Sequence, residues 1–268
     1  MINISAAAPP AGEFRIGHVF SQAAAVLSRN FLIFFVVTLV AGSPRLLFTT
    51  AGSVAGMLGR VSLGLFLSFV LNMLGQAIVV YAAFQDMRNR PVDIGESLRV
   101  ALSRVLSIIG IAVCIGTAFM VVFVLPVAVG TFFLRPNLYV ALPLAIGIAI
   151  GAAVAVFLLT MWIVATPACV VERRGPLSSI GRSSNLTKGH RWKVFGMVLL
   201  LFAVAALISS VVRGLLGLTG SSTLATLGTL AWIGVWGAFY ATVVVVTYHD
   251  LRVAKEGVDT DQIASVFD

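Results

Sequence analysis

Charged side chains are scarce in this chain of 268 residues: Asp, Glu, Lys and Arg make up only 10% of the sequence, whereas apolar residues make up 59%. An ordinary soluble domain carries about 25% charged residues and roughly 45–50% apolar residues. A chain with so few charges cannot cover its own surface with groups that water solvates. The composition therefore excludes an ordinary soluble protein and favours an integral membrane protein.

Residues that commonly build redox, metal or catalytic sites are also few. The two cysteines, Cys114 and Cys169, fall in apolar runs without metal or redox spacing, so we interpret them as small packing residues. The three histidines, His18, His190 and His249, lack ligand spacing, and no pair of acidic residues is placed for acid/base chemistry. We therefore predict no catalytic residue, no metal site, no cofactor and no enzymatic activity.

The sequence is dominated by long apolar runs without charged residues. A helix needs about 20 apolar residues to cross a hydrocarbon core of roughly 30 Å. One run extends from about Leu27 to Arg45, and five more contain no Lys, Arg, Asp or Glu: 61–84, 105–134, 136–171, 194–212 and 214–249. We predict an all-α polytopic membrane protein with about six transmembrane helices arranged as three hairpins, in which residues 1–268 form a single membrane domain.

The distribution of Lys and Arg predicts the orientation, because these residues collect on cytoplasmic loops. If the N-terminus lies inside, only four of the 18 basic residues fall on the far side: Arg45, Arg60, Arg135 and Arg213. All ten acidic residues lie on the same side as the basic majority. We expect a multi-pass protein of the bacterial inner (cytoplasmic) membrane with both termini in the cytoplasm and a cytoplasmic tail over 253–268.

An internal repeat is indicated by two stripes of apolar residues with the same spacing. The second follows the first by 78 residues, and the stripes consist of Ile16, Phe20, Ala23, Ala24 and Leu27, and of Ile94, Leu98, Ala101, Leu102 and Val105. At 100° per residue each stripe occupies one helical face, which is typical of a helix lying in the membrane interface. We predict repeat units 13–88, 91–171 and 175–252, each introduced by a cytoplasmic interfacial helix. The alternative is that the stripes belong to ordinary amphipathic linkers.

Polar residues inside the predicted spans are few, and none is a carboxylate, which argues against a proton-coupled pump. Asn72 and Gln76 lie one turn apart on the second span. They supply either hydrogen bonds between helices or a possible intramembrane polar contact to a substrate. On the last span, Trp232, Trp236 and Tyr240 follow one another at intervals of four residues, which packing or lipid contact explains most simply.

The cytoplasmic segment over 172–195 concentrates basic residues beside Ser, Asn and Thr. Its candidate site for a lipid head group or phosphate comprises Arg182, Lys188, Arg191 and Lys193. The alternative is that these residues only anchor the chain at the cytoplasmic surface.

The same segment resembles a known bacterial family, named after the membrane domain of glycerophosphoryl diester phosphodiesterase. The residues that carry the resemblance are Val171, Glu172, Gly175, Pro176, Arg182, Ser183, Leu186, Thr187, Gly189, Trp192 and Phe195, together with 248–252 and 255–259 near the C-terminus. The resemblance implies a multi-helix membrane module that in some relatives is fused to a phosphodiesterase domain. That catalytic domain is a barrel of about 250 residues, for which this chain has no room outside its predicted spans.

These observations favour a non-enzymatic inner-membrane protein that binds phospholipid head groups, or scaffolds a protein partner, at the cytoplasmic face. Binding of nucleic acid is not expected, and the oligomeric state is left open. One alternative is a transporter or channel for a hydrophobic or amphipathic small molecule, with Pro44, Pro126, Asn72 and Gln76 along its path. A second alternative is a membrane subunit of a phosphodiesterase-type enzyme of lipid metabolism.

Overall fold

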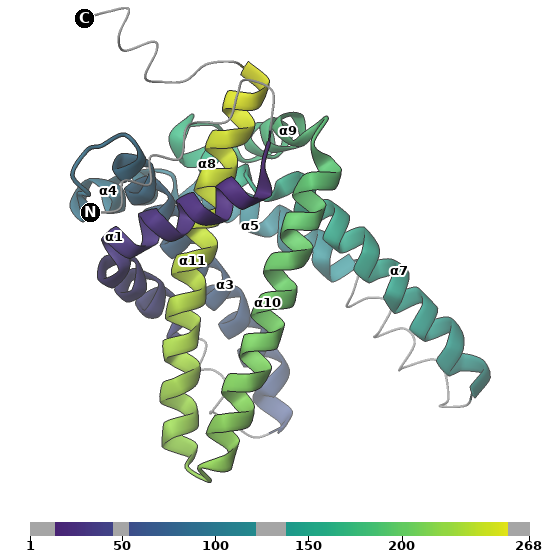
Figure 1. The fold of residues 1–268 in the computed structure, drawn as a ribbon. Helices are drawn as coiled ribbons and strands as arrows, with labels where there is room; N and C mark the ends of the chain where they lie inside the picture. The colour runs from purple at the N-terminus through teal and green to yellow at the C-terminus, as the bar shows by residue number, and fades with distance from the viewer. Residues whose placement is uncertain (1–13, 45–53, 122–137, 257–268) are drawn as a thin grey trace, which may run out of the picture.

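The described part of the chain is helical, which confirms the predicted fold class. The computed structural model describes residues 14–44, 54–121 and 138–256, and within these ranges there is no β-strand. Pro126 lies outside the described residues. The helices, drawn in Figure 1, are α1 (Ile16–Gly42), α3 (Val54–Met87), α4 (Ile94–Ser103), α5 (Val105–Phe119), α7 (Leu138–Trp162), α8 (Ala165–Val171), α9 (Pro176–Thr187), α10 (Arg191–Leu218) and α11 (Ser222–Glu256).

Several helices are long and apolar enough to cross a membrane, which confirms a multi-pass membrane protein. Among the described residues five spans meet this criterion by length and composition, and the pair α4 and α5 forms a sixth if the two helices are counted as one bent span. The two helices of that pair meet at an angle of 65°. The expected number of about six spans therefore agrees with the structure.

Helix α11 lies at the centre of the fold and packs against α1, α3 and α10 (Figure 1). Its fully buried residues are mostly small, including Ala238, Ala241 and the valines at 243–246. Inside a membrane, lipid tails are as apolar as the side chains, so helices associate through close van der Waals packing at small residues. The small residues of α11 allow its neighbours to approach closely.

Two glycines mark close contacts of helix α1 with its neighbours. A Cβ atom added at Gly75 of α3 would lie 2.4 Å from the Cβ of Ala41, and one added at Gly237 of α11 would lie 3.0 Å from the Cβ of Thr38. The hydroxyl of Thr38 also donates a hydrogen bond of 2.7 Å to the carbonyl oxygen of Gly234. Helix α1 is therefore fixed against α3 and α11 by contacts that larger residues would prevent.

Helix α1 is bent at Asn30, whose backbone is not helical (φ −124°, ψ 24°). The Asn30 side chain donates a hydrogen bond of 2.8 Å to Asp86, and Arg29 forms an ion pair of 2.6 Å with the same carboxylate. Asp86 lies at the end of α3, so the bend in α1 is held by a neighbouring helix. This side-chain pairing accounts for the kink without a proline.

The uncharged run 136–171 does not form one continuous helix. It is divided between α7 and α8 by a break at residues 163–164. The hydroxyl of Ser183 on α9 donates a hydrogen bond of 2.7 Å to the carbonyl oxygen of Met161, next to this break. A backbone acceptor near the break is therefore satisfied by a different helix, a long-range contact that the run of apolar residues does not reveal.

We predict that Gly75→Ala destabilises the fold by about 1–3 kcal/mol, because the new methyl group overpacks the contact between α1 and α3. Gly196→Ala in α10 is the matched control, since a Cβ there would meet nothing within 4 Å. The control should be neutral or stabilising by up to about 1 kcal/mol through helix propensity. Thermal unfolding of the detergent-solubilised protein measures both, and a Gly75→Ala variant as stable as Gly196→Ala would contradict the prediction.

Candidate functional site

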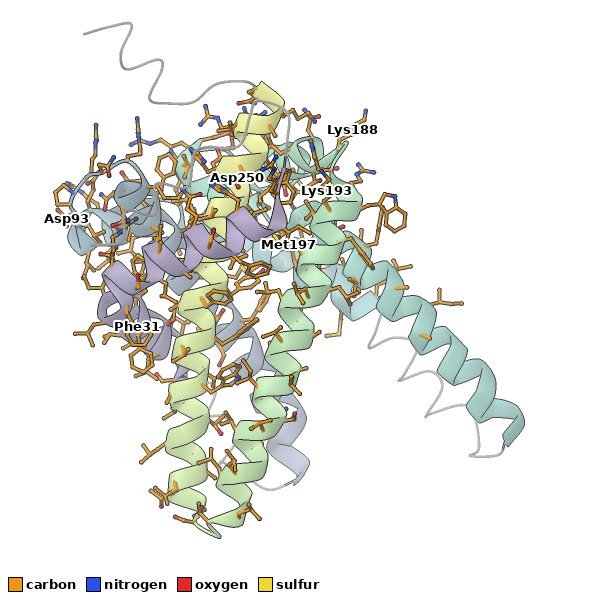
Figure 2. All side chains as sticks on the ribbon, viewed as in Figure 1. Phe31, Asp93, Lys188, Lys193, Met197 and Asp250 are labelled. Carbon is orange, nitrogen blue, oxygen red and sulfur yellow. The ribbon has the colours of Figure 1, made fainter. Side chains whose placement is uncertain are left out.

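Charged side chains gather at one end of the molecule, which we call the charged end. Figure 2 shows Asp93, Lys188, Lys193 and Asp250 there, whereas Phe31 lies lower on the bundle. In the described ranges the charged end holds six carboxylates, at positions 86, 93, 96, 172, 250 and 256. Fourteen basic residues accompany them: Arg15, Arg29, Arg88, Arg90, Arg99, Arg104, Arg173, Arg174, Arg182, Lys188, Arg191, Lys193, Arg252 and Lys255. Positive charge is therefore in clear excess.

Glu172, directly after α8, is the most heavily bonded carboxylate of the charged end. It accepts hydrogen bonds from the Tyr248 hydroxyl at 2.7 Å, from Arg182 Nε at 2.9 Å and from Arg174 Nε at 2.6 Å. Arg182 also pairs with Glu256 near the end of α11. We call these five residues the Glu172 cluster. The cluster joins the end of α8, helix α9 and helix α11.

The Glu172 side chain is only 11% exposed, yet its surroundings favour the ionised form. Burial by itself would raise the pKa of this carboxyl group, but the hydrogen bonds from Tyr248 and Arg182, together with the charge of Arg182, hold the pKa below its usual range. Glu172 is therefore a carboxylate that stabilises the fold in its charged state.

The other described carboxylates of the charged end also have partners within the chain. Asp86 binds Arg29 and Asn30, as described above. Asp250 Oδ2 lies 3.0 Å from His18 Nδ1. Glu96 accepts hydrogen bonds of 2.8 Å from both Tyr81 and Gln85, and Asp93 caps the N-terminus of α4 by accepting from the Glu96 amide. The acidic side chains are thus engaged, and the surplus of positive charge stays on the surface.

The four predicted head-group residues have different surroundings. Arg182 is 16% exposed and belongs to the Glu172 cluster. Lys193 donates a hydrogen bond of 3.3 Å to the carbonyl oxygen of Phe14. Lys188 is exposed, and Arg191 has a buried Nε atom without a hydrogen-bond partner among the described residues. No described carboxylate forms an ion pair with Lys188, Arg191 or Lys193.

These three cations lie around the start of α10, and we call them the α10 cations. The first turn of this 28-residue helix contains no acidic residue, and its N-cap residue, His190, makes no side-chain capping bond. Trp192, beside them, is 85% exposed. A helix N-terminus with free amide groups already attracts anions, and three adjacent positive charges strengthen that attraction.

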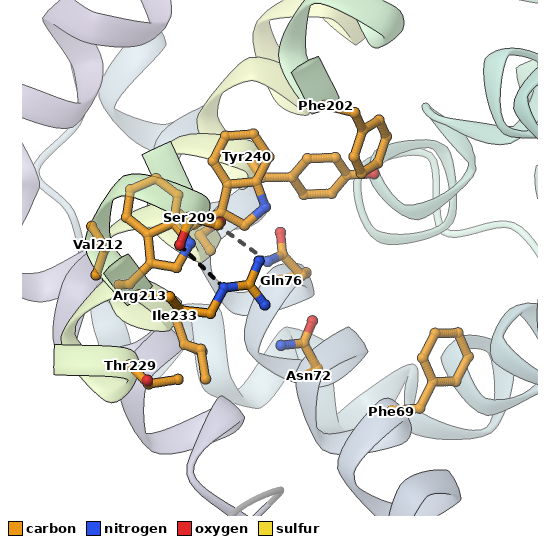
Figure 3. Close-up of a pocket in the computed structure, with 13 residues that line it drawn as sticks. Phe69, Asn72, Gln76, Phe202, Ser209, Val212, Arg213, Thr229, Ile233 and Tyr240 are labelled. Atoms are coloured by element: carbon orange, nitrogen blue, oxygen red, sulfur yellow. Dashed lines mark hydrogen bonds between the residues drawn. The ribbon is translucent and has the colours of Figure 1, made fainter. Parts of the chain in front are cut away.

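Asn72 and Gln76 line a cavity of about 630 Å³ between α3, α10 and α11. The Gln76 side chain donates a hydrogen bond of 3.2 Å to the carbonyl oxygen of Gly237, which links α3 to α11. Figure 3 shows the polar ends of Asn72 and Gln76 directed into this space. The full lining comprises Phe69, Asn72, Gln76, Phe202, Ser209, Val212, Arg213, Thr229, Trp232, Ile233, Trp236, Gly237 and Tyr240.

Arg213 is a member of this cavity that the sequence did not reveal as a site residue. We expected it only as a basic residue on the far side of the membrane. The structure places its guanidinium group in the cavity, where Nε donates a hydrogen bond of 3.1 Å to the carbonyl oxygen of Ser209 (Figure 3). The aromatic residues Trp232, Trp236 and Tyr240 line the same space. In the sequence, Asn72 and Gln76 were the residues predicted as a possible polar contact here, whereas the aromatic residues were interpreted as packing or lipid contacts.

Among the described residues no group of His, Cys, Asp or Glu side chains is arranged to hold a metal ion. Cys169 is buried and Cys114 is partly buried, and both are free thiols.

We predict that Glu172→Gln lowers the free energy of unfolding by roughly 2 kcal/mol, because the largely buried Arg182 loses one of its two carboxylate partners. Glu96→Gln is the control, since exposed Glu96 accepts hydrogen bonds from the neutral groups of Tyr81 and Gln85. The control should change stability by less than about 1 kcal/mol. Equal thermal stability of the two variants in detergent would contradict this role for Glu172.

The lowered pKa of Glu172 predicts a pH dependence with a defined sign. A carboxyl group whose pKa is lower in the folded than in the unfolded state contributes its full stabilisation above its ordinary pKa of about 4.3, and loses it as the pH falls through the folded value. The difference in melting temperature between the unmodified protein and Glu172→Gln should therefore shrink on acidification from pH 7 toward about pH 3. A difference that stays constant over this range would contradict the prediction.

Comparison of the chain with protein-family models, with curated proteins and with solved structures finds no match. The resemblance to the membrane domain of glycerophosphoryl diester phosphodiesterase therefore stays a prediction from the residues that carry it.

Proposed function

We propose that this is a non-enzymatic, multi-pass protein of the bacterial inner membrane that binds the head groups of anionic phospholipids at its cytoplasmic face. The observation that carries the proposal is the group of α10 cations, Lys188, Arg191 and Lys193, none of which pairs with a described carboxylate. The prediction from sequence included Arg182. Because Arg182 is engaged by Glu172 and Glu256, we now assign head-group binding to the α10 cations.

Electrostatics support this assignment. Each described carboxylate of the charged end has a partner inside the chain, so none of them neutralises the α10 cations. A phosphate group at this position would meet the amide groups of the first turn of α10 as well as the three side chains. Phospholipids supply such phosphates at high local concentration along the whole membrane surface.

The depth of the site in the membrane is also suitable. Trp192 is 85% exposed, and tryptophan is enriched at the level of the lipid head groups. From Arg191 to Arg213, helix α10 rises about 33 Å, close to the thickness of the hydrocarbon core of roughly 30 Å. If the α10 cations lie at one membrane interface, Arg213 lies near the other.

We further propose that three short helices lie along the cytoplasmic interface and introduce three membrane hairpins. The bend of α1 at Asn30, the 65° angle between α4 and α5, and the short helix α9 support this arrangement. On α4, the residues Ile94, Leu98 and Leu102 are exposed, as expected of an apolar stripe in contact with lipid. With the charged end in the cytoplasm, the described ends of the chain at Phe14 and Glu256 lie there as well, as the positive-inside rule favours.

We predict that the triple variant Lys188→Gln/Arg191→Gln/Lys193→Gln binds phosphatidylglycerol at least about tenfold more weakly. A direct hydrogen bond between a charged side chain and a phosphate contributes about 1.5–3 kcal/mol, and about 1.4 kcal/mol corresponds to a factor of ten. Native mass spectrometry of the detergent-solubilised protein, titrated with phosphatidylglycerol and separately with phosphatidylcholine, measures the loss.

The matched control removes the same charge elsewhere on the charged end, through Arg90→Gln/Arg99→Gln/Arg173→Gln, since these three side chains are also exposed. The control should retain phosphatidylglycerol binding to within about a factor of three, because only diffuse attraction to the anionic surface is reduced. If both triple variants lose binding equally, the basic residues act only as a general cytoplasmic anchor, and the proposed site is wrong.

A further inference from the structure

The cavity between α3, α10 and α11 lies away from the charged end and is bounded along the helices by two contacts between α10 and α11. Helices α10 and α11 contact one another on both sides of it, through Met197 and Thr247 toward the charged end and through Leu216 and Gly228 toward the opposite end. Between these contacts the cavity reaches about 630 Å³, within the range of about 300–1,000 Å³ found for sites that hold small molecules. A space of this size between otherwise close-packed helices can hold a ligand.

The lining residues show that the cavity is elongated along the helices. On α10 they extend from Phe202 to Arg213, and on α11 from Thr229 to Tyr240. Each stretch spans eleven residue steps along its helix, which is a rise of about 16 Å. A ligand that fills the cavity therefore lies along the helix axes, across the thickness of the membrane.

One wall is aromatic. The rings of Trp232 and Trp236 are stacked with their centroids 6.0 Å apart, and Tyr240 lies 6.5 Å from both Trp236 and Phe202. These rings offer a large apolar surface of limited flexibility, which suits the hydrocarbon part of an amphipathic molecule.

At the end of the cavity near Thr229 and Trp232, Arg213 carries a positive charge without a counter-ion among the described residues. Arg213 uses Nε to bind the Ser209 carbonyl oxygen, and no described side chain accepts from the rest of its guanidinium group. The sequence contains no Asp or Glu from 97 to 171 or from 173 to 249, and the acidic residues that exist belong to the charged end or to the chain termini. Within the described ranges, no carboxylate lies at the level of Arg213.

Arg213 lies near the end of its span, where its guanidinium group is exposed and has no described counter-ion. The guanidinium group presents several N–H donors in a planar fork that fits carboxylate and phosphate oxygens. We therefore propose that the cavity binds an elongated amphipathic anion, with its carboxylate or phosphate on Arg213 and its hydrocarbon part along Trp232, Trp236 and Tyr240. Asn72 and Gln76 border the cavity from α3 and add polar groups to its wall.

Quenching of tryptophan fluorescence tests the proposal, because two of the four tryptophans line the cavity. In a Trp162→Phe/Trp192→Phe background, only Trp232 and Trp236 emit. The probes are a dibrominated long-chain fatty acid, whose bromine atoms quench on contact, and its uncharged methyl ester. A dibrominated alkyl phosphate provides a third arm and distinguishes carboxylate from phosphate as the preferred head group.

Half-maximal quenching by the acid should need a concentration about tenfold lower than quenching by the ester. A charge-assisted hydrogen bond to arginine is strong enough to account for a tenfold difference in affinity. Arg213→Gln should remove this preference, whereas Arg213→Lys should keep most of it by retaining the charge. The Lys188→Gln/Arg191→Gln/Lys193→Gln variant should bind the acid as the unmodified protein does, so this result is independent of head-group binding at the charged end.

A cavity-filling variant and its matched control test whether the probes bind in the cavity. Ser209→Phe should weaken quenching by acid and ester alike, because the new ring occupies the cavity, while Ser210→Phe, on the exposed face of the same helix, should leave both unchanged. The proposal is overturned if acid and ester quench equally, if Arg213→Gln keeps the preference for the acid, or if Ser209→Phe has no effect beyond that of Ser210→Phe.

Discussion

A hydrocarbon interior does not solvate charge, and the arrangement of this protein follows from that constraint. Every acidic residue lies outside the predicted spans, and most basic residues lie with them. The charges that meet at the charged end then determine its local structure. Asp86 holds the bend of α1, Asp93 caps α4, and Glu172 joins α8, α9 and α11. Helices that would otherwise meet only through apolar surfaces are fixed by specific polar contacts.

The fold class and the multi-span character could be predicted from the sequence because they depend on properties that are local along the chain. Runs without charge predicted the long apolar helices. The break between α7 and α8 could not be predicted. It is accompanied by the hydrogen bond from Ser183 to Met161, between residues 22 positions apart, and apolar composition alone carries no signal of such a contact.

The candidate sites also depend on contacts between residues that are distant in the sequence, which the sequence alone does not reveal. The sequence grouped Arg182 with Lys188, Arg191 and Lys193 because they are neighbours along the chain. In the structure Arg182 pairs with Glu256, 74 residues away, and so differs from the other three. Arg213 is a second case. Its position near the end of a span was evident from the sequence, but its place in a cavity depends on how α3, α10 and α11 diverge between their contacts.

Helix α11 connects these features because its two sides have different compositions. Gly234 and Gly237 allow α1 to approach closely, whereas Trp232, Trp236 and Tyr240 are bulky and line the cavity toward α10. Close packing on one side keeps α11 in place. The space beside its aromatic residues can therefore remain a cavity instead of being filled by side chains of neighbouring helices. Eight residues beyond Tyr240, about 12 Å along the helix, Tyr248 binds Glu172 in the charged end. Helix α11 therefore connects the wall of the cavity with the Glu172 cluster at the charged end.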